Sequence, residues 1–141
     1  MEGRANAVHQ SSHIVGNLRL GTIITPKGRR YYDFSLKIDV MTRSRGSFGV
    51  VFRMVDNFNL LAFEFNIENG YKRVIRIQNG QIHVLKIIYD GGISQNNWIK
   101  VLIKAQKNKF IVRCGDSKKY SNYNATPIVF EFEDITFPKG E

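Results

Sequence analysis

Three residues spaced two apart, Glu64, Asn66 and Glu68, stand in the segment NLLAFEFNIENG and could together do chemistry. In an extended strand alternate side chains point to the same face, so these three share a face with Leu60 and Ala62. Paired carboxylates on one face suit glycoside hydrolysis, in which one attacks the sugar and the other protonates the leaving oxygen. The same spacing also fits the solvated side of a sheet, or a sugar-binding face without catalysis.

A second group of candidate residues is basic. The chain has 21 Lys and Arg against 12 Asp and Glu, a formal net charge of +9, and such a surface attracts sulfated glycans, acidic lipids, nucleic acid or acidic proteins. Basic clusters on one face would bind sulfate or phosphate groups, whereas scattered lysines would only protect sheet edges from aggregation. The sequence shows neither an RNA-recognition signature nor a recognition helix, which argues against nucleic acid. The clustered residues are Lys72, Arg73 and Arg76 on one predicted strand, and Lys100 and Lys104 on another.

The remaining reactive side chains form weaker patterns. Cys114 is the only cysteine, so no internal disulfide is possible, and its place in the alternating segment KFIVRCG predicts a buried, inert thiol. His9 and His13 are four residues apart, which is a metal-ligand spacing only on a helix, and the sequence around them is polar and aperiodic. His83 stands in an alternating segment and is predicted to be a half-exposed sheet residue.

The elements that must position these residues are strands. Residues 31–41 place Phe34, Leu36, Ile38 and Val40 on one face, the pattern of a half-buried antiparallel strand. Residues 48–55 are apolar on both faces, which predicts a central strand. The pairs Asn69-Gly70 and Asn79-Gly80 predict tight hairpin turns, because Asn and Gly accept the positive φ of a type I′ turn. The other predicted strands are 17–24, 59–68, 71–77, 81–89, 98–106, 109–115 and 128–137.

The length and composition suit one soluble domain. The 141 residues can bury a core without disulfides, and no apolar run approaches the ~20 residues needed to cross a bilayer. Residues 1–13 are polar and aperiodic and are predicted to be a disordered arm, which leaves 14–141 as the domain. Many short strands with no helical stripe predict an all-β fold, a β-sandwich or barrel of antiparallel strands.

Four segments occur in an order that resembles a known superfamily: YYDFSLKIDV, GSFGVVFRMVDNFNLLAFEF, YKRVIRIQNG and NNWIKVLIKAQKNKFIVRCGD. Over roughly residues 17–140 the chain resembles the concanavalin A-like lectin/glucanase superfamily, on its laminin G-like and thrombospondin C-terminal side. The characteristic pieces are Gly49 with Phe52-Arg53, Asp56-Asn57 before an aromatic-rich strand, and Asn97-Trp98 at a strand start.

This resemblance implies a jelly-roll β-sandwich of two antiparallel sheets that binds glycans, cell-surface receptors or matrix proteins, as lectin-like and cell-adhesion domains do. Retaining glucanases of the superfamily carry Glu-x-Asp-x-Glu, but the middle residue here is Asn66, which cannot ionise and cannot tune the proton balance. Some laminin G-like domains bind calcium, so the loop residues Asp56, Asp90 and Asp116 are possible calcium ligands with no other cofactor expected.

The hypothesis that joins these observations is a non-catalytic binding module of a larger, secreted or cell-surface protein. It would engage a glycan, including an anionic one, or a protein partner. One alternative is a glycoside hydrolase with Glu64 as nucleophile and Glu68 as acid/base; another is a structural domain that packs on its own parent chain. The predicted ligand-binding residues are Arg53, Glu64, Asn66, Lys72, Arg73, Arg76, Lys100 and Lys104.

Overall fold

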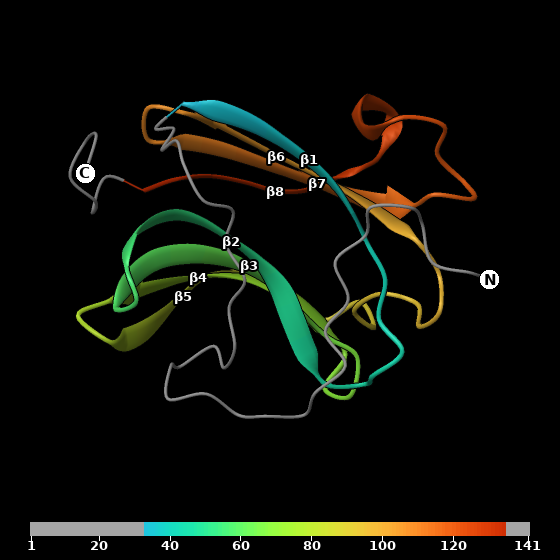
Figure 1. Ribbon diagram of the computed structural model, residues 1–141, viewed down its shortest axis with the longest axis horizontal. Coiled ribbons are helices and arrows are strands. Elements are labelled where there is room, and N and C mark those ends of the chain that lie inside the picture. Colours follow the sequence, from blue (N-terminus) through green and yellow to red (C-terminus); the bar gives the residue numbers. More distant parts are fainter. Residues whose placement is uncertain (1–32, 135–141) are drawn as a thin grey trace.

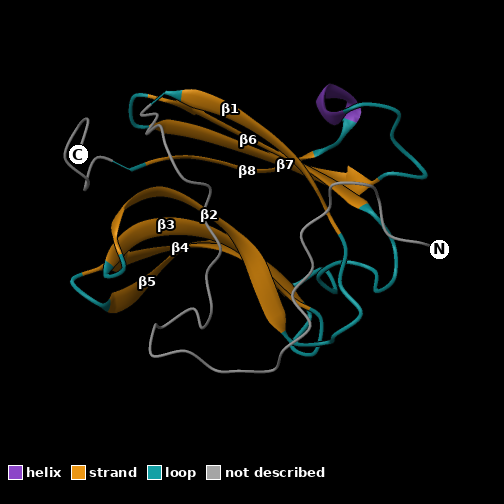
Figure 2. Ribbon diagram, viewed as in Figure 1, coloured by secondary structure: helices purple, strands orange, loops and turns teal. Residues whose placement is uncertain are grey.

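A computed structural model of the protein describes residues 33–134, which form eight strands and one short 3₁₀ helix (Figures 1 and 2). The predictions for 1–13 and 17–24, and for the end of the last strand after residue 134, lie outside the described residues. The helix, Tyr123–Ala125, is far too short to cross a membrane. The strands are β1 (Phe34–Val40), β2 (Ser47–Asp56), β3 (Asn59–Asn66), β4 (Tyr71–Gln78), β5 (Gln81–Ile88), β6 (Ile99–Gln106), β7 (Lys109–Asp116) and β8 (Ile128–Glu133).

The strands form two four-stranded antiparallel sheets that stack face to face (Figure 1). Sheet A has the order β1-β6-β7-β8, and sheet B has the order β2-β3-β4-β5. The chain leaves sheet A after β1, runs through all of sheet B from β2 to β5, and returns for β6 to β8. The predicted all-β sandwich of two antiparallel sheets is therefore confirmed.

One of the two tight hairpin turns predicted in sheet B is found as predicted. Asn79 and Gly80 both have positive φ, 51° and 81°, as a type I′ turn between β4 and β5 requires. The turn between β3 and β4 differs from the predicted type I′ turn: it spans residues 67–70, and Gly70 has φ 74° whereas Asn69 has no positive φ. These turns set the register in which each residue of β4 faces its neighbours on β3 and β5.

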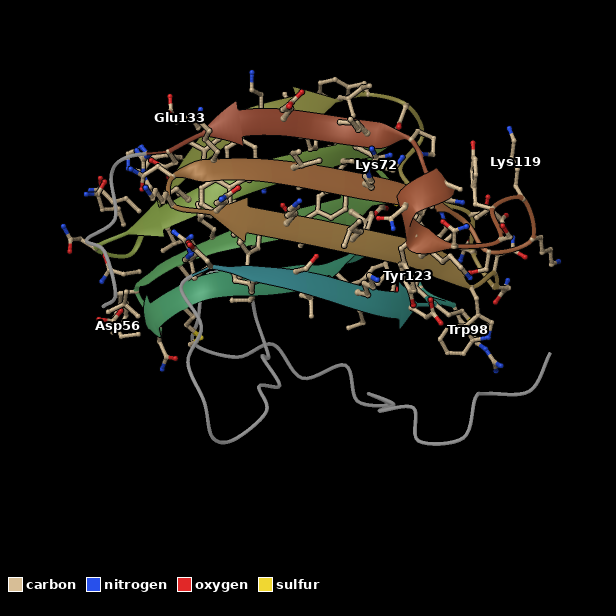
Figure 3. All side chains as sticks on the ribbon, turned by 90° about the horizontal axis from the view of Figure 1, so that it is seen from above. Asp56, Lys72, Trp98, Lys119, Tyr123 and Glu133 are labelled. Carbon is tan, nitrogen blue, oxygen red and sulfur yellow. The ribbon has the colours of Figure 1, made fainter. Side chains whose placement is uncertain are left out.

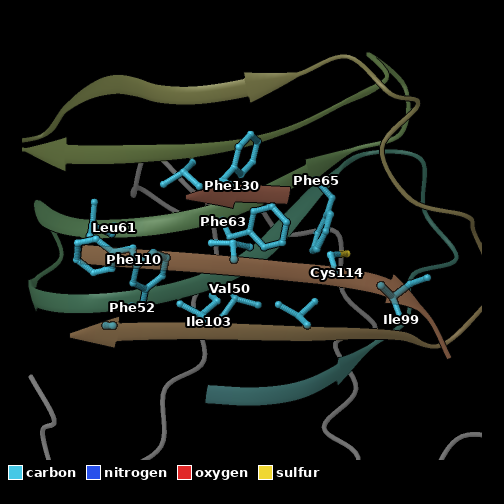
Figure 4. Close-up of a cluster of buried hydrophobic side chains, with 14 of the residues drawn as sticks. Val50, Phe52, Leu61, Phe63, Phe65, Ile99, Ile103, Phe110, Cys114 and Phe130 are labelled. Carbon is cyan, nitrogen blue, oxygen red and sulfur yellow. The ribbon is translucent and has the colours of Figure 1, made fainter. Parts of the chain in front are cut away.

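The core lies between the sheets and is built from the alternating apolar faces (Figure 4). Phe63 is fully buried and packs edge-on against Phe65 and Phe130, with ring centroids 4.6 and 6.1 Å apart. Phe34 and its alternate neighbours on β1 pack against this core, as predicted. Burial of one such aromatic side chain contributes roughly 1.5–3 kcal/mol, so the core is the main source of stability.

The outer face of sheet B differs from the prediction. Leu60 and Ala62 are 0% and 3% exposed, and with Ile75 and Ile77 they form a second apolar cluster that does not face sheet A. Glu64 and Asn66 of the same strand are also buried, so the solvated-face interpretation of β3 is wrong. A period of two shows which side chains share a face, but it does not show whether water reaches that face.

The predicted central position of β2 is not found among residues 33–134. Residues 48–55 are apolar on both faces, yet within the described residues β2 is the first strand of its sheet and pairs only with β3. Its outward side chains Val51 and Met54 pack on the second apolar cluster, which explains the apolar pattern without a central position.

Candidate functional site

Polar and aromatic side chains gather at one end of the outer face of sheet B. They come from neighbouring positions on three adjacent strands and from the residue that follows β5. The opposite half of the same face carries the apolar cluster around Leu60 and Ile77, so the polar end is a distinct feature. We call it the outer patch; its members are Ser47, Glu64, Asn66, Tyr71, Arg73 and Tyr89.

An ion pair lies at the centre of the outer patch. Glu64 and Arg73 face each other across β3 and β4, and Arg73 Nε donates to Glu64 Oε1. Ser47 Oγ on β2 donates to the other oxygen, Glu64 Oε2. The side chains of Glu64 and Arg73 are 12% and 20% exposed, so the pair is held mostly out of water with both carboxylate oxygens engaged. This arrangement fixes the plane of the guanidinium.

Two tyrosines continue the outer patch from the ion pair towards the edge of the sheet. The Arg73 guanidinium lies over the Tyr71 ring, 5.0 Å from its centroid. The Tyr71 and Tyr89 rings meet edge to face at 6.0 Å. Tyr89 is 73% exposed, the largest exposure among the large hydrophobic side chains of the described residues. The Arg73 guanidinium, the Tyr71 ring and the exposed Tyr89 ring therefore follow one another across the patch.

Asn66 has a local structural role within the outer patch. Its side-chain oxygen accepts the Asn69 N–H at 2.8 Å and so closes the turn from β3 to β4. The carbonyl oxygen of Asn66 would lie 3.0 Å from a Cβ added at Gly92, so the loop after β5 packs tightly behind this turn. The Asn66 side chain, at the position where the glucanase pattern has aspartate, therefore stabilises the turn between β3 and β4.

Two of the predicted basic residues of β4 point inward instead. Lys72 Nζ donates to Asp90 Oδ2 at 2.6 Å and to the Gly92 carbonyl oxygen at 2.5 Å. Arg76 pairs with Asp134 at 3.4 Å, where the carboxylate side chain is 4% exposed. Of Lys72, Arg73 and Arg76, the structure thus brings only Arg73 to the outer patch, because alternate residues of a strand face opposite sides.

Arg53 is also engaged in structural contacts, at the far end of β2. It has φ 50° at an irregular point in the pairing of β2 with β3. Its guanidinium pairs with Asp33 at 3.6 Å, donates to the Lys107 carbonyl oxygen at 2.7 Å, and lies 5.0 Å from the centroid of the Phe110 ring. These contacts tie the start of β1 and the β6–β7 turn to sheet B.

Lys100 and Lys104 belong to β6 and lie on the other sheet. Lys100 Nζ is 5.5 Å from the centroid of the Tyr123 ring and 3.3 Å from Ser117 Oγ, while Lys104 is exposed. In the view of Figure 3, Trp98, Tyr123 and Lys119 lie towards one end of the strands and Asp56 and Glu133 towards the other. The eight predicted ligand-binding residues therefore do not form one site; Glu64, Asn66 and Arg73 do come together.

A small pocket opens near the same end of the sandwich. Its volume is about 170 Å³, below the roughly 300–1,000 Å³ typical of ligand pockets. Its ammonium group, from Lys72, is already bound by Asp90 and a carbonyl oxygen. The buried Cys114 lines it, and burial raises the pKa of that thiol to about 12, in line with the predicted inert cysteine. We therefore regard the pocket as packing space.

The possible calcium ligands are dispersed. The described residues contain no group of three or more His, Cys, Asp or Glu side chains that could hold a metal ion. Asp56 accepts hydrogen bonds from the Asn59 side chain and the Phe58 N–H, which lower the pKa of its carboxyl group. Asp90 pairs with Lys72, and Asp116 accepts the Lys118 N–H, so each acid stabilises its own loop.

Sequence reasoning missed three members of the outer patch. Ser47, Tyr71 and Tyr89 belong to separate strands or loops, and only the pairing register brings them beside Glu64. The sequence signal for the register was insufficient, because the β3–β4 turn is longer than the predicted two residues and the pairing of β4 with β5 shifts between Val74 and Ile75. Counting outward from a two-residue turn at Asn69-Gly70 would place Glu68 opposite Tyr71. The four-residue turn of the structure instead places Asn66 opposite Tyr71 and Glu64 opposite Arg73.

Comparisons with known proteins bear on the fold. A scan against protein-family models and a search of curated proteins find no match for this chain. Among solved structures the chain is similar to the carbohydrate-binding module CBM66 from Bacillus subtilis, with a TM-score of 0.63 and 18% sequence identity. The match covers 78% of this chain and 64% of that one, so this chain spans somewhat less than two thirds of that module. At this identity the similarity shows a shared fold.

Proposed function

We propose that the chain is a non-catalytic carbohydrate-binding module that holds a glycan on the outer patch. The observation that carries the proposal is the Arg73 guanidinium, which Glu64 orients over the Tyr71 ring, with the exposed ring of Tyr89 next to Tyr71. Sugar hydroxyls need directed polar partners, and the apolar C–H face of a sugar ring packs on an aromatic ring. The fold similarity to a carbohydrate-binding module supports the same proposal.

The contacts of Glu64 argue against hydrolysis at this patch. A retaining glycosidase needs a free nucleophilic carboxylate and an acid/base about 5 Å from it. Both oxygens of Glu64 are engaged by Arg73 and Ser47. Strand β3 ends at Asn66, so Glu68 stands on the turn rather than on the face that carries Glu64. These two residues suit a binding surface better than a catalytic pair.

The proposal extends to the concanavalin A-like superfamily on its laminin G-like side, and to a module of a secreted or cell-surface protein. Two antiparallel sheets packed as a sandwich agree with that superfamily. Gly49 is one of the residues on which the resemblance to that superfamily rests. It lies on β2 directly opposite Glu64, so one of those residues is next to the proposed site.

A glycan array followed by calorimetry tests the proposal. We expect Tyr89→Ala to weaken binding of the best-retained oligosaccharide about tenfold, through loss of its exposed ring. Phe58→Ala is the matched control, because Phe58 is a similarly exposed ring, 59% accessible, at the opposite end of sheet B. Unchanged affinity in Tyr89→Ala, together with loss of binding in Lys100→Glu with Lys104→Glu, would move the site to sheet A and refute the proposal.

A structural role through the edge of sheet B is the second candidate. Among residues 33–134, five of the seven exposed large hydrophobic side chains belong to β5 or the residue after it: Ile82, Val84, Ile87, Ile88 and Tyr89. Within the described residues β5 pairs only with β4, and an unpaired apolar edge can accept another strand. Binding of no glycan on the array, with self-association that Ile87→Lys abolishes, would favour this role.

A further inference from the structure

We propose that residues 17–24, NLRLGTII, pack as a third layer over the apolar half of the outer face of sheet B. The inference goes beyond the proposed function, because it assigns a partner to a part of the sheet that lies outside the outer patch. Leu60, Ile75 and Ile77 belong to the cluster that does not face sheet A, yet they are 0%, 0% and 1% exposed. Side chains on one face of a sheet shield each other only from the side, so complete burial requires a layer on top of them.

The described part of the chain, residues 33–134, does not supply that layer. Sheet A lies on the opposite side of sheet B, and the 3₁₀ helix contacts β6 and β7 (Figure 1). The loop after β5 packs against the end of β3, where Gly92 lies next to the Asn66 backbone. Phe58, in the turn between β2 and β3, is itself 59% exposed and can shield only the end of the cluster. The exposures are those of a single chain, so the covering layer comes from the rest of that chain.

The burial of this face is centred on β3 and β4 and weakens towards β5. Ile82 and Val84 stand opposite Ile77 and Ile75 on β5, and they are 36% and 48% exposed. On the other side of the cluster, Val51 and Met54 of β2 are partly buried and pack against it. The layer therefore covers the two middle strands from the side of β2 and leaves the β5 edge open.

The N-terminal part of the chain arrives on the β2 side. Asp33, the first described residue, pairs with Arg53 of β2 at 3.6 Å, and the next residue of that strand, Met54, lies against the cluster. Residue 24 precedes Asp33 by nine residues, which can span up to about 30 Å. The distance from β2 to β4 is only about 10 Å, because neighbouring strands lie about 4.8 Å apart. Residues 17–24 can therefore reach the face without constraint.

The side chains of this segment also match the surface. In an extended segment Leu18, Leu20 and Ile24 share one side, and the cluster that they would cover is likewise aliphatic. The only other part of the chain outside the described residues is 135–141, ITFPKGE, which offers two large apolar side chains before a proline. Two side chains cover less of a four-residue cluster than three do, so we assign the layer to residues 17–24.

Nuclear Overhauser contacts between methyl groups of the full chain, labelled at Ile, Leu and Val methyls, test the assignment. We expect contacts from the methyl groups of Ile75 and Ile77 to those of Leu18, Leu20 or Ile24. Contacts to residues 135–141 instead, contacts of residues 17–24 with β2 alone, or contacts only between molecules in a sample that mixes labelled and unlabelled chains would each overturn it. So would the absence of any contact from this cluster to residues outside 33–134.

A pair of variants adds a second readout. Leu20→Ser removes an apolar side chain from the covering side of the segment, and we expect it to lower Tm on the order of 10 °C. Arg19→Ser, the neighbouring position on the opposite side, is the matched control and should change Tm by less than about 3 °C. Equal shifts in the two variants contradict the inference. If Leu20→Ser does not fold, the methyl contacts of the unmodified chain decide alone, and neither result bears on glycan binding at the outer patch.

Discussion

The ion pair of Glu64 and Arg73 leads to a quantitative prediction about stability. Replacing either residue by glutamine leaves its partner charged and mostly buried, since the two side chains are only 12% and 20% exposed. Breaking a fully buried pair costs about 3–5 kcal/mol, while an exposed pair contributes at most about 1 kcal/mol. The partial exposure of this pair places each single substitution between those limits, at about 2 kcal/mol of unfolding free energy.

A double-mutant cycle measures the coupling directly. Glu64→Gln, Arg73→Gln and the double variant are unfolded in urea, and we expect the double variant to be at least about 1 kcal/mol more stable than the sum of the singles predicts. In thermal unfolding each single change should lower Tm on the order of 5–10 °C for a domain of this size. Glu131→Gln, the same change on an exposed strand position, should stay within about 0.5 kcal/mol.

The cycle can refute the description of the patch. Additive effects within about 0.5 kcal/mol would mean that the two side chains do not interact as a held pair. Arg73 would then lack a fixed orientation, and the argument for directed hydrogen bonds to a sugar would lose its basis.

Three further predictions concern other parts of the sandwich. Gly49→Ala should lose about 2 kcal/mol or more, because its Cβ would lie 2.1 Å from a backbone oxygen of β3, whereas Gly46→Ala, with its nearest atom at 3.4 Å, should be nearly neutral in the same urea titration. Burial raises the pKa of Cys114 from 9.0 to about 12, so unfolding releases its proton between those pH values and stability should fall there more steeply than in Cys114→Ala. Lys72→Met should accelerate amide exchange at Gly92, which the ammonium group holds, without changing protection in sheet A.

Much of the fold follows from local rules. The alternation of Phe34 to Val40 predicts which face of β1 meets the core, and the Asn79-Gly80 pair predicts the hairpin between β4 and β5. The position of β2 in its sheet could not be predicted from its apolar sequence. A strand that is apolar on both faces can be central, or it can pack its outer side chains on a second apolar cluster, as Val51 and Met54 do. Those arrangements differ only in contacts between distant residues, which no local pattern contains.

The site was harder to predict than the fold for the same reason. The basic residues Lys72, Arg73 and Arg76 look alike in the sequence, yet the alternation of β4 sends Lys72 and Arg76 inward to acidic partners and only Arg73 outward. Spacing correctly placed Glu64 and Asn66 on one face. It could not show that Glu64 would be held by an arginine from the next strand, which depends on register.

The most direct test of the central claim is an NMR titration of the ¹⁵N-labelled chain with the oligosaccharide best retained on the glycan array. The account predicts that the largest amide shift changes occur at Ser47, Arg73 and Tyr89, on the outer face of sheet B. Shift changes confined to Lys100, Lys104 and their neighbours on sheet A would contradict it.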